Sequence, residues 1–352
     1  ALVPGVNEER ADGCGSRYPQ WDKGAGMLQT AFEAIDTGVP YPMKAYFIHR
    51  HNPFIAMPDT NEQRRILNKL DLIVAVDVNF SETAWFADVI LPESTFLERA
   101  SILRTEKGLK PGFGRRQQCV KPLNNTKAGW EIYLELAKRM GKGESFPFQS
   151  IEDIWQYQLQ DTGLTVADFD AKGFVKLSDK ALWYDRDKLK FGTESGKIEI
   201  ISPKWEAMGI PSLPAYVAPD APPAGSFRLL FGRNGYQAHG HHHNNPILHE
   251  LLDTNKLWIN SQAAKKLGIK DGDLVKVSAG AEQGTIAAYV TDLIHPEAVF
   301  MLHGFGTDVP AKKRSFGKGL ADQMYMIGKL KEWDKAGGGL NLAESFVTVT
   351  PV

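Results

Sequence analysis

The chemically richest stretch of this 352-residue chain is a polar loop that combines four histidines, one arginine and two adjacent asparagines. An arginine can bind a phosphate through two parallel hydrogen bonds, and asparagine and histidine side chains can satisfy the ring donors and acceptors of a nitrogen heterocycle. The loop therefore predicts contact with a phosphorylated heterocyclic cofactor. The candidate residues are Arg233, His239, His241, Asn244 and Asn245.

Two other interpretations of this loop stay open. Imidazoles at short spacing can supply nitrogen ligands to a metal, but no cysteine or carboxylate accompanies them, and consecutive histidines in an extended loop point in different directions. We therefore predict no metal ligand here. The loop could also be an ordinary solvated segment. If it does face a substrate, His239 and His241, with Arg233, are the candidates for supplying protons or charge.

A second candidate site is centred on Asp77. The strand predicted over residues 71–78 is mainly apolar, and its apolar run ends in the carboxylate of Asp77. In an open α/β sheet, ligands lie beyond the carboxyl ends of the strands, and a carboxylate there can accept two hydrogen bonds from a guanine or a ribose. A buried strand followed by an ordinary turn explains the same pattern. The expected neighbours of Asp77 in a cofactor site are Asn52, Asn79, Glu82 and Thr83.

Elements of alternating type must position these residues. Helical spacing predicts helices over 26–37 and 61–70, and apolar β-branched runs predict strands over 43–49 and 71–78. Strands that alternate with helices imply a parallel sheet. Further along the chain, the pattern predicts an amphipathic helix over 126–140 that covers the sheet, a weaker helix over 150–160 and an alternating strand over 197–200.

Five prolines between residues 211 and 225 indicate a linker, because proline stiffens the chain and withholds a backbone donor from any sheet. Short strands separated by turns follow it, with one helix over 261–267. This pattern predicts a small β-barrel. The predicted strands cover residues 227–231, 256–259, 274–279, 284–290, 298–301 and 345–350.

The composition narrows the class of protein. A formal net charge of -1 leaves no basic field for nucleic acid, and the longest apolar stretches are too short to span a bilayer. The two cysteines, Cys14 and Cys119, show no iron–sulfur or zinc spacing. Three charged residues, Glu93, Glu98 and Arg99, are expected to form an exposed ion-pair set of little energetic weight.

Several segments resemble the molybdopterin oxidoreductases of the dimethyl sulfoxide reductase superfamily. They are the Asn52-Pro53 turn, residues 76–99, the turn at 193–199 and residues 257–275. The resemblance implies an α/β fold: a Rossmann-like parallel-sheet domain, in its C-terminal half, followed by a double-psi β-barrel. We accordingly expect the end of a pterin-dinucleotide-binding domain over 1–150, a connecting segment over 151–225 and a dinucleotide-binding barrel over 226–352.

Within this superfamily, the barrel segments are most similar to the catalytic subunits of polysulfide and thiosulfate reductases. The segments are residues 232–246, 301–306, 315–319 and 337–341, the last of which adds Asn341 to the cofactor-binding candidates. The resemblance implies a bis(molybdopterin guanine dinucleotide) cofactor with molybdenum or tungsten, and a substrate such as polysulfide, thiosulfate or tetrathionate. Arsenate, formate or nitrate as substrate, and a cofactor-free scaffold in an electron-transfer complex, stay open as alternatives.

Catalytic subunits of this family begin with a cysteine-rich segment that holds a [4Fe–4S] cluster, and the present chain resembles only their C-terminal portion. The resemblance implies that the cluster belongs to the N-terminal part or to a companion chain, and that this chain alone does not turn over. It also implies an iron–sulfur electron-transfer subunit and a membrane anchor subunit as partners, and a periplasmic or other extracytoplasmic location.

Overall fold

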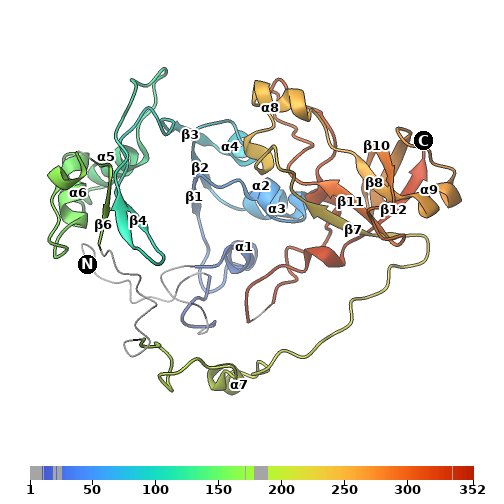
Figure 1. Cartoon of the computed structure of the whole chain (residues 1–352), viewed down its shortest axis with the longest axis horizontal. Helices are drawn as coiled ribbons and strands as arrows, with labels where there is room; N and C mark the ends of the chain where they lie inside the picture. The colour runs from blue at the N-terminus through green and yellow to red at the C-terminus, as the bar shows by residue number, and fades with distance from the viewer. Residues whose placement is uncertain are drawn as a thin grey trace. The chain divides into compact units, whose positions relative to one another are not determined.

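The computed structural model describes residues 10, 12–18, 21, 26–170, 172–177, 189–334 and 336–352. The chain divides into two compact units (Figure 1). Of the described residues, the first unit contains 76–78 and 90–201, and the second contains the others. The domain boundaries predicted at residues 150 and 225 are assigned by the ligand that each domain is expected to bind, whereas the two units are defined by internal contacts. The predicted boundaries therefore stay a prediction.

A three-stranded parallel sheet with the order β1-β2-β3 confirms the predicted alternation of strands and helices. Side chains start two of the helices: Asp59 accepts a hydrogen bond from the backbone N–H of Glu62, and Ser81 accepts one from that of Ala84. The elements are β1 (Ala45–His49), β2 (Leu72–Asp77) and β3 (Val89–Pro92), with α1 (Leu28–Thr37), α2 (Pro53–Ala56), α3 (Thr60–Leu67) and α4 (Glu82–Phe86).

The first unit holds a second sheet that the sequence analysis did not predict. Its antiparallel strands are only three residues long, too short to show an alternating pattern. Trp155 and Phe169 are buried in the core of this unit. The elements are β4 (Arg104–Glu106), β5 (Gly112–Gly114) and β6 (Phe174–Lys176), with α5 (Gly129–Arg139), α6 (Ile151–Gln158), η1 (Gly143–Ser145) and η2 (Val166–Phe169).

Two expectations for this unit are wrong. Residues 197–200 form no strand, and Ile198 and Ile200 are 72% and 84% exposed, because no neighbouring strand pairs with them. Glu93, Glu98 and Arg99 are all buried rather than exposed, and Arg99 Nη1 lies 2.6 Å from Glu93 Oε1. The Glu93 carboxylate also accepts a hydrogen bond from the backbone N–H of Gly129, so it holds the start of α5.

The second half of the chain forms a closed six-stranded barrel with the order β10-β8-β11-β7-β12-β9, which confirms the predicted small β-barrel. Strands β10 and β8 pair in parallel, as do β11 and β7, whereas the other pairs are antiparallel. The strands are β7 (Phe227–Gly232), β8 (Leu257–Asn260), β9 (Leu274–Ala279), β10 (Glu282–Thr291), β11 (Ala298–Leu302) and β12 (Phe346–Pro351).

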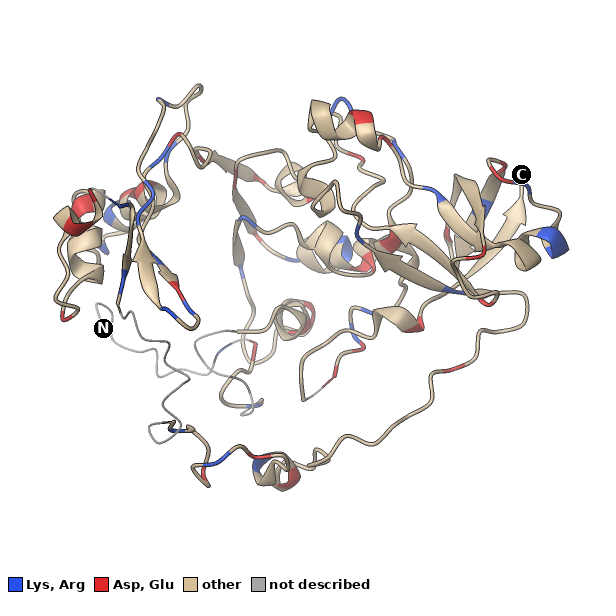
Figure 2. Ribbon diagram, in the orientation of Figure 1, with Lys and Arg blue, Asp and Glu red and all other residues tan. Residues whose placement is uncertain are grey.

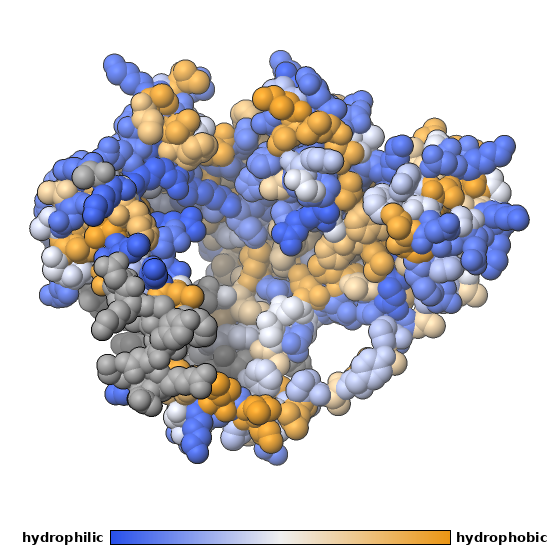
Figure 3. Space-filling model, in the orientation of Figure 1, coloured by the Kyte–Doolittle hydropathy of each residue, from blue (hydrophilic) through white to orange (hydrophobic). Residues whose placement is uncertain are grey.

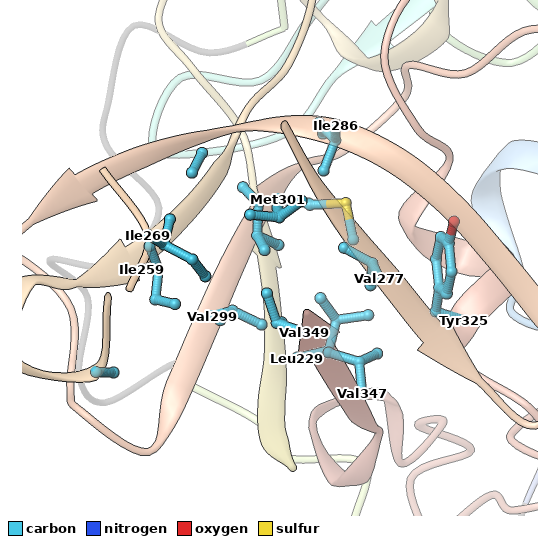
Figure 4. Packing of buried hydrophobic residues seen from close by; sticks show 14 of the residues in the cluster. Leu229, Ile259, Ile269, Val277, Ile286, Val299, Met301, Tyr325, Val347 and Val349 are labelled. Atoms are coloured by element: carbon cyan, nitrogen blue, oxygen red, sulfur yellow. The ribbon is translucent and has the colours of Figure 1, made fainter. Parts of the chain in front are cut away.

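Alternate residues of the barrel strands fill its interior. Leu229, Val277 and Met301 come from three different strands and are completely buried (Figure 4). Such burial of apolar area is the main stabilising term for a small barrel. The remaining elements of the second unit are α7 (Pro203–Ala207), α8 (Pro246–Leu251), α9 (Ser261–Leu267), η5 (His239–His241), η6 (Asp322–Tyr325) and η7 (Leu342–Glu344).

The surface carries charges of both signs on most elements, without a continuous basic stripe (Figure 2). This agrees with the near-zero formal net charge. Apolar side chains gather over α8, where Ile247 and Leu251 are exposed (Figure 3). Among the described residues, no helix combines the length and the hydropathy needed to cross a membrane.

Candidate functional site

A buried hydrogen-bonded network brings together three of the residues predicted from sequence. Asn52 precedes α2, and Glu82 and Thr83 begin α4. The Asn52 Nδ2 amide donates to Glu82 Oε2 at 2.6 Å, and the Thr83 hydroxyl donates to Asn52 Oδ1 at 2.8 Å. The tight turn at Asn52-Pro53 therefore faces the start of α4, as a predicted site at this sheet edge requires.

Lys312, from the long loop after β11, completes this network. Its Nζ atom donates to Glu82 Oε1 at 2.7 Å, and the side chains of Lys312 and Glu82 are only 10% and 5% exposed. Burial raises the pKa of Glu82, but the charge of Lys312 and the hydrogen bonds from Lys312, Thr307 and Asn52 outweigh it, so the pKa lies below its ordinary value. The carboxylate is therefore ionised at neutral pH.

The histidine loop packs against the same long loop at Gly304. His239 has a φ of 47°, and Gly304 has a φ of 97°, in the region that favours glycine. A Cβ atom at Gly304 would lie 2.8 Å from the backbone nitrogen of Gly240 and 3.0 Å from His243 Cε1. Only glycine allows this approach, so Gly304 sets the position of the histidine loop.

His243 is the buried member of the histidine run. Its ring stacks on Phe305 with the centroids 3.9 Å apart. Burial, followed by the charge of Lys312, lowers the pKa of His243 to about 4, whereas Glu82 and a hydrogen bond with the Gly304 backbone act in the opposite direction. His243 is therefore neutral at physiological pH and acts here as a packed ring with one donor and one acceptor nitrogen.

Four buried polar atoms of these two loops find no hydrogen-bond partner within the described part of the chain. They are Gln237 Oε1, His239 Nδ1, His243 Nδ1 and Ser315 Oγ. A buried polar atom without a partner costs about 1–3 kcal/mol, so native structures rarely leave one unsatisfied. Four such atoms on two loops in contact indicate a surface built to receive a ligand with several donors and acceptors.

The other predicted loop residues lie around this surface. Arg233 and His241 are exposed. Asn244 Oδ1 accepts from the backbone N–H of Arg314 at 3.0 Å and so ties the two loops together. Asn245 instead starts α8, where its Oδ1 atom accepts from the first backbone N–H groups of the helix.

Three further candidates lie outside the network. Asp77 ends β2 and accepts a hydrogen bond from the backbone N–H of Val78 at 2.7 Å, but it belongs to the first compact unit. Asn79 is exposed beside it, and Asn341 is exposed before η7.

The sequence analysis missed Lys312, His303 and Asp322. A lysine in a run of basic residues and a histidine after a strand carry no distinctive pattern.

Two other sites are less well supported. No three side chains of the metal-binding types converge in the ranges that the structure describes. A cleft of about 330 Å³ in the first unit is lined partly by Ser94, Glu98 and Thr126. These groups are already satisfied, since Ser94 and Thr126 bond each other and Glu98 accepts from the backbone of Thr95.

Two family models match the chain. One described as molybdopterin oxidoreductase covers residues 18–139, and one described as molydopterin dinucleotide binding domain covers residues 227–321. The second match includes most of the histidine loop and Lys312, and the first includes Asn52 and Glu82. Both halves of the buried network therefore fall in segments that the family models recognise.

Similar proteins agree with these models. The molybdopterin-containing subunit of thiosulfate reductase from Salmonella typhimurium is 30% identical over 90% of this chain and 45% of that protein. Acetylene hydratase from Syntrophotalea acetylenica is 28% identical over 70% of this chain and 35% of its own length. The solved structure of acetylene hydratase from Pelobacter acetylenicus superposes with a TM-score of 0.78 over 92% of this chain and 46% of that one, at 23% identity. The chain spans less than half the length of these relatives.

Proposed function

Because this chain belongs to the molybdopterin oxidoreductase family, we propose that it is part of an oxidoreductase that carries a bis(molybdopterin guanine dinucleotide) with molybdenum or tungsten. When bound, such a cofactor supplies two-electron exchange with a substrate. The residues of this chain hold and orient the pterin dinucleotides. We propose that its barrel, with two parallel and four antiparallel strand pairings, is a double-psi barrel as in that family.

The observation that carries this proposal is the set of unsatisfied buried atoms on the two loops. Gln237 Oε1, His239 Nδ1, His243 Nδ1 and Ser315 Oγ offer unsatisfied hydrogen-bonding positions to a ligand. A pterin ring system presents alternating donors and acceptors along its edges, and it therefore suits this set. The exposed Arg233 suits a phosphate of the same ligand.

The Asn52, Glu82, Thr83 and Lys312 network has a supporting role in this proposal. Its side chains already hydrogen-bond to one another. They therefore hold the loop after β11 in place and need no ligand to complete their hydrogen bonds. Asp77 at the end of β2 is proposed to accept hydrogen bonds from a guanine, because its half-buried carboxylate ends a strand of the parallel sheet. Asn79, His241, Asn244, Asn245 and Asn341 are proposed as peripheral contacts.

We further propose that the substrate is an inorganic sulfur compound such as polysulfide, thiosulfate or tetrathionate. The support is the 30% identity with a thiosulfate reductase subunit along 90% of this chain. Other relatives are named for acetylene hydration and trimethylamine N-oxide reduction, so substrates differ among the similar proteins. The proposal therefore names a class of substrate and no single compound.

The partners are also proposals. Since the chain spans less than half of its relatives, an N-terminal portion or companion chain with a [4Fe–4S] cluster is proposed to complete the catalytic subunit. An iron–sulfur electron-transfer subunit, a membrane anchor subunit and a periplasmic location follow the same family analogy.

Metal analysis of the complex purified from its native source tests the proposed function. We expect about one molybdenum or tungsten atom per copy of this chain, together with oxidised pterin released on denaturation. A complex that retains all its subunits but contains neither metal nor pterin would contradict the proposal and would favour the cofactor-free scaffold.

A further inference from the structure

A histidine and a buried carboxylate form a pair at the edge of the candidate site. His303 follows β11, and Asp322 begins η6. The two Asp322 oxygens lie 3.0 and 2.9 Å from His303 Nδ1. The Asp322 side chain is 0% exposed and that of His303 is 11% exposed. A carboxylate so far from water needs a hydrogen-bond donor, and this imidazole supplies it.

The pairing determines which nitrogen of His303 is available for chemistry. A carboxylate accepts hydrogen bonds and does not donate them, so Nδ1 carries a hydrogen in both the neutral and the charged imidazole. Nε2 is then the nitrogen that gains or loses a proton, and no hydrogen bond from the described residues occupies it.

The surroundings of His303 place it beside the unsatisfied atoms. Its ring meets that of His239 edge to face with the centroids 5.0 Å apart, and Phe231 lies 6.0 Å away on another side. The charged or titratable groups that act on His239 are His303, Arg233, His241 and Asp322, and those that act on His243 are Lys312, Glu82 and His303. Asp322 is the acidic group among those that act on His239.

We propose that His303, held by Asp322, is the residue that donates a proton to the sulfur substrate. This inference rests on the proposed function. Reductive cleavage of thiosulfate breaks its sulfur–sulfur bond and takes up two electrons, from an iron–sulfur electron carrier, and two protons. The products are HS⁻ and HSO₃⁻. One proton passes from His303 Nε2 to the departing sulfur and the other comes from water, after which His303 regains its proton from solvent.

The geometry favours His303 over the two histidines that the sequence suggested for this role. His241 is exposed, and no carboxylate orients its ring. Burial, together with the charges of His303, Arg233 and His241, lowers the pKa of His239 against the opposing effect of Asp322. A neutral imidazole accepts hydrogen bonds from a ligand but does not donate an ionic proton. His239 therefore suits binding, and His303 suits proton transfer.

The test uses His303→Asn in the complete enzyme complex. The asparagine amide can still donate to Asp322 but cannot carry the proton. We expect kcat for thiosulfate reduction to fall by about 10²–10⁴-fold with little change in KM. The pH profile of kcat should also change in the variant, because an asparagine amide does not titrate as an imidazole does. Asp322→Asn should reduce kcat less, because His303 remains and the amide oxygen can still accept from its Nδ1–H, although the negative charge is gone.

A binding measurement gives a second result that does not depend on turnover. Sodium sulfite is titrated into the complex by calorimetry in buffers of different ionisation enthalpy, which counts the protons taken up. Uptake should be smaller in His303→Asn than in wild type. The matched control is His295→Asn, which changes an exposed histidine in the turn between β10 and β11 and should behave as wild type.

The outcomes distinguish a failure of the proposed role of His303 from a failure of the proposed function. If wild type and His303→Asn contain equal metal and pterin, yet share the same kcat, pH profile and proton uptake, the role of His303 is overturned and the proposed function stands. If the wild-type complex contains no pterin or does not reduce sulfur compounds, the proposed function fails and this inference fails with it.

Discussion

Replacing Lys312 with methionine should destabilise the protein by about 3–5 kcal/mol, because the carboxylate of Glu82 would remain buried without its cation. The Lys312 Nζ to Glu82 Oε1 distance is 2.7 Å, and both side chains are almost completely buried. The methionine matches the length of the aliphatic stem, so the loss comes from the charge rather than from a cavity. The midpoint of thermal unfolding, followed by circular dichroism, measures it.

Two variants distinguish the buried pair from an ordinary surface charge. Lys313→Met removes the neighbouring exposed lysine and should leave the midpoint almost unchanged. The double variant Lys312→Met with Glu82→Gln removes both charges, and it should regain most of the stability that the single variant loses. A Lys312→Met protein as stable as wild type would show that the pair does not hold the loop after β11.

The same pair predicts a dependence of stability on acid. The folded pKa of Glu82 lies below its ordinary value of 4.5, so the ionised carboxylate stabilises the folded state above that pH. This contribution is lost as the pH falls from about 4.5 through the depressed folded value. The unfolding midpoint of wild type should therefore fall more steeply below this pH than that of the double variant. Parallel curves for the two proteins would contradict the ion pair.

Gly304→Ala should abolish most cofactor retention while the barrel remains folded. An alanine Cβ would lie 2.8 Å from the Gly240 backbone nitrogen and 2.8 Å from the His239 carbonyl carbon, where no flexible side chain can yield. The histidine loop must then move, and the unsatisfied atoms of His239 and His243 move with it. Metal and pterin content per chain, measured on the purified complex, should fall at least about tenfold, since a loop shift costs the ligand several hydrogen bonds.

Gly317→Ala is the matched control for this variant. Gly317 also has a positive φ, of 69°, but a Cβ there would meet nothing within 4 Å. The Gly317→Ala variant has the backbone strain of an alanine at a positive φ, about 1 kcal/mol, without a steric clash of its Cβ atom. Gly317→Ala should keep its cofactor. Equal cofactor content in both variants would mean that the approach of the two loops at Gly304 does not shape the site.

Local pattern explains why the elements near the site were predictable. Residues 72–76 are a continuous apolar run, and Ser261 to Leu267 follow a capping asparagine, so each signals its own structure without help from distant residues. The segment over 197–200 shows the limit of that reasoning. Its alternation is typical of a strand, but a strand exists only when a partner pairs with it.

The amino-acid sequence by itself determined the alternation of strands and helices, the small barrel and the family, because these depend on short-range periodicity and on contiguous motifs. It also predicted Asn52, Glu82 and Thr83 as neighbours, and hydrogen bonds join them in the structure, whereas their part in binding a cofactor stays a prediction. Only the tertiary structure decided that Lys312 neutralises Glu82, that Asp322 orients His303, and that Asn245 starts a helix. Those pairings join residues up to 230 positions apart, and burial, which gives them their energy, exists only in the folded chain.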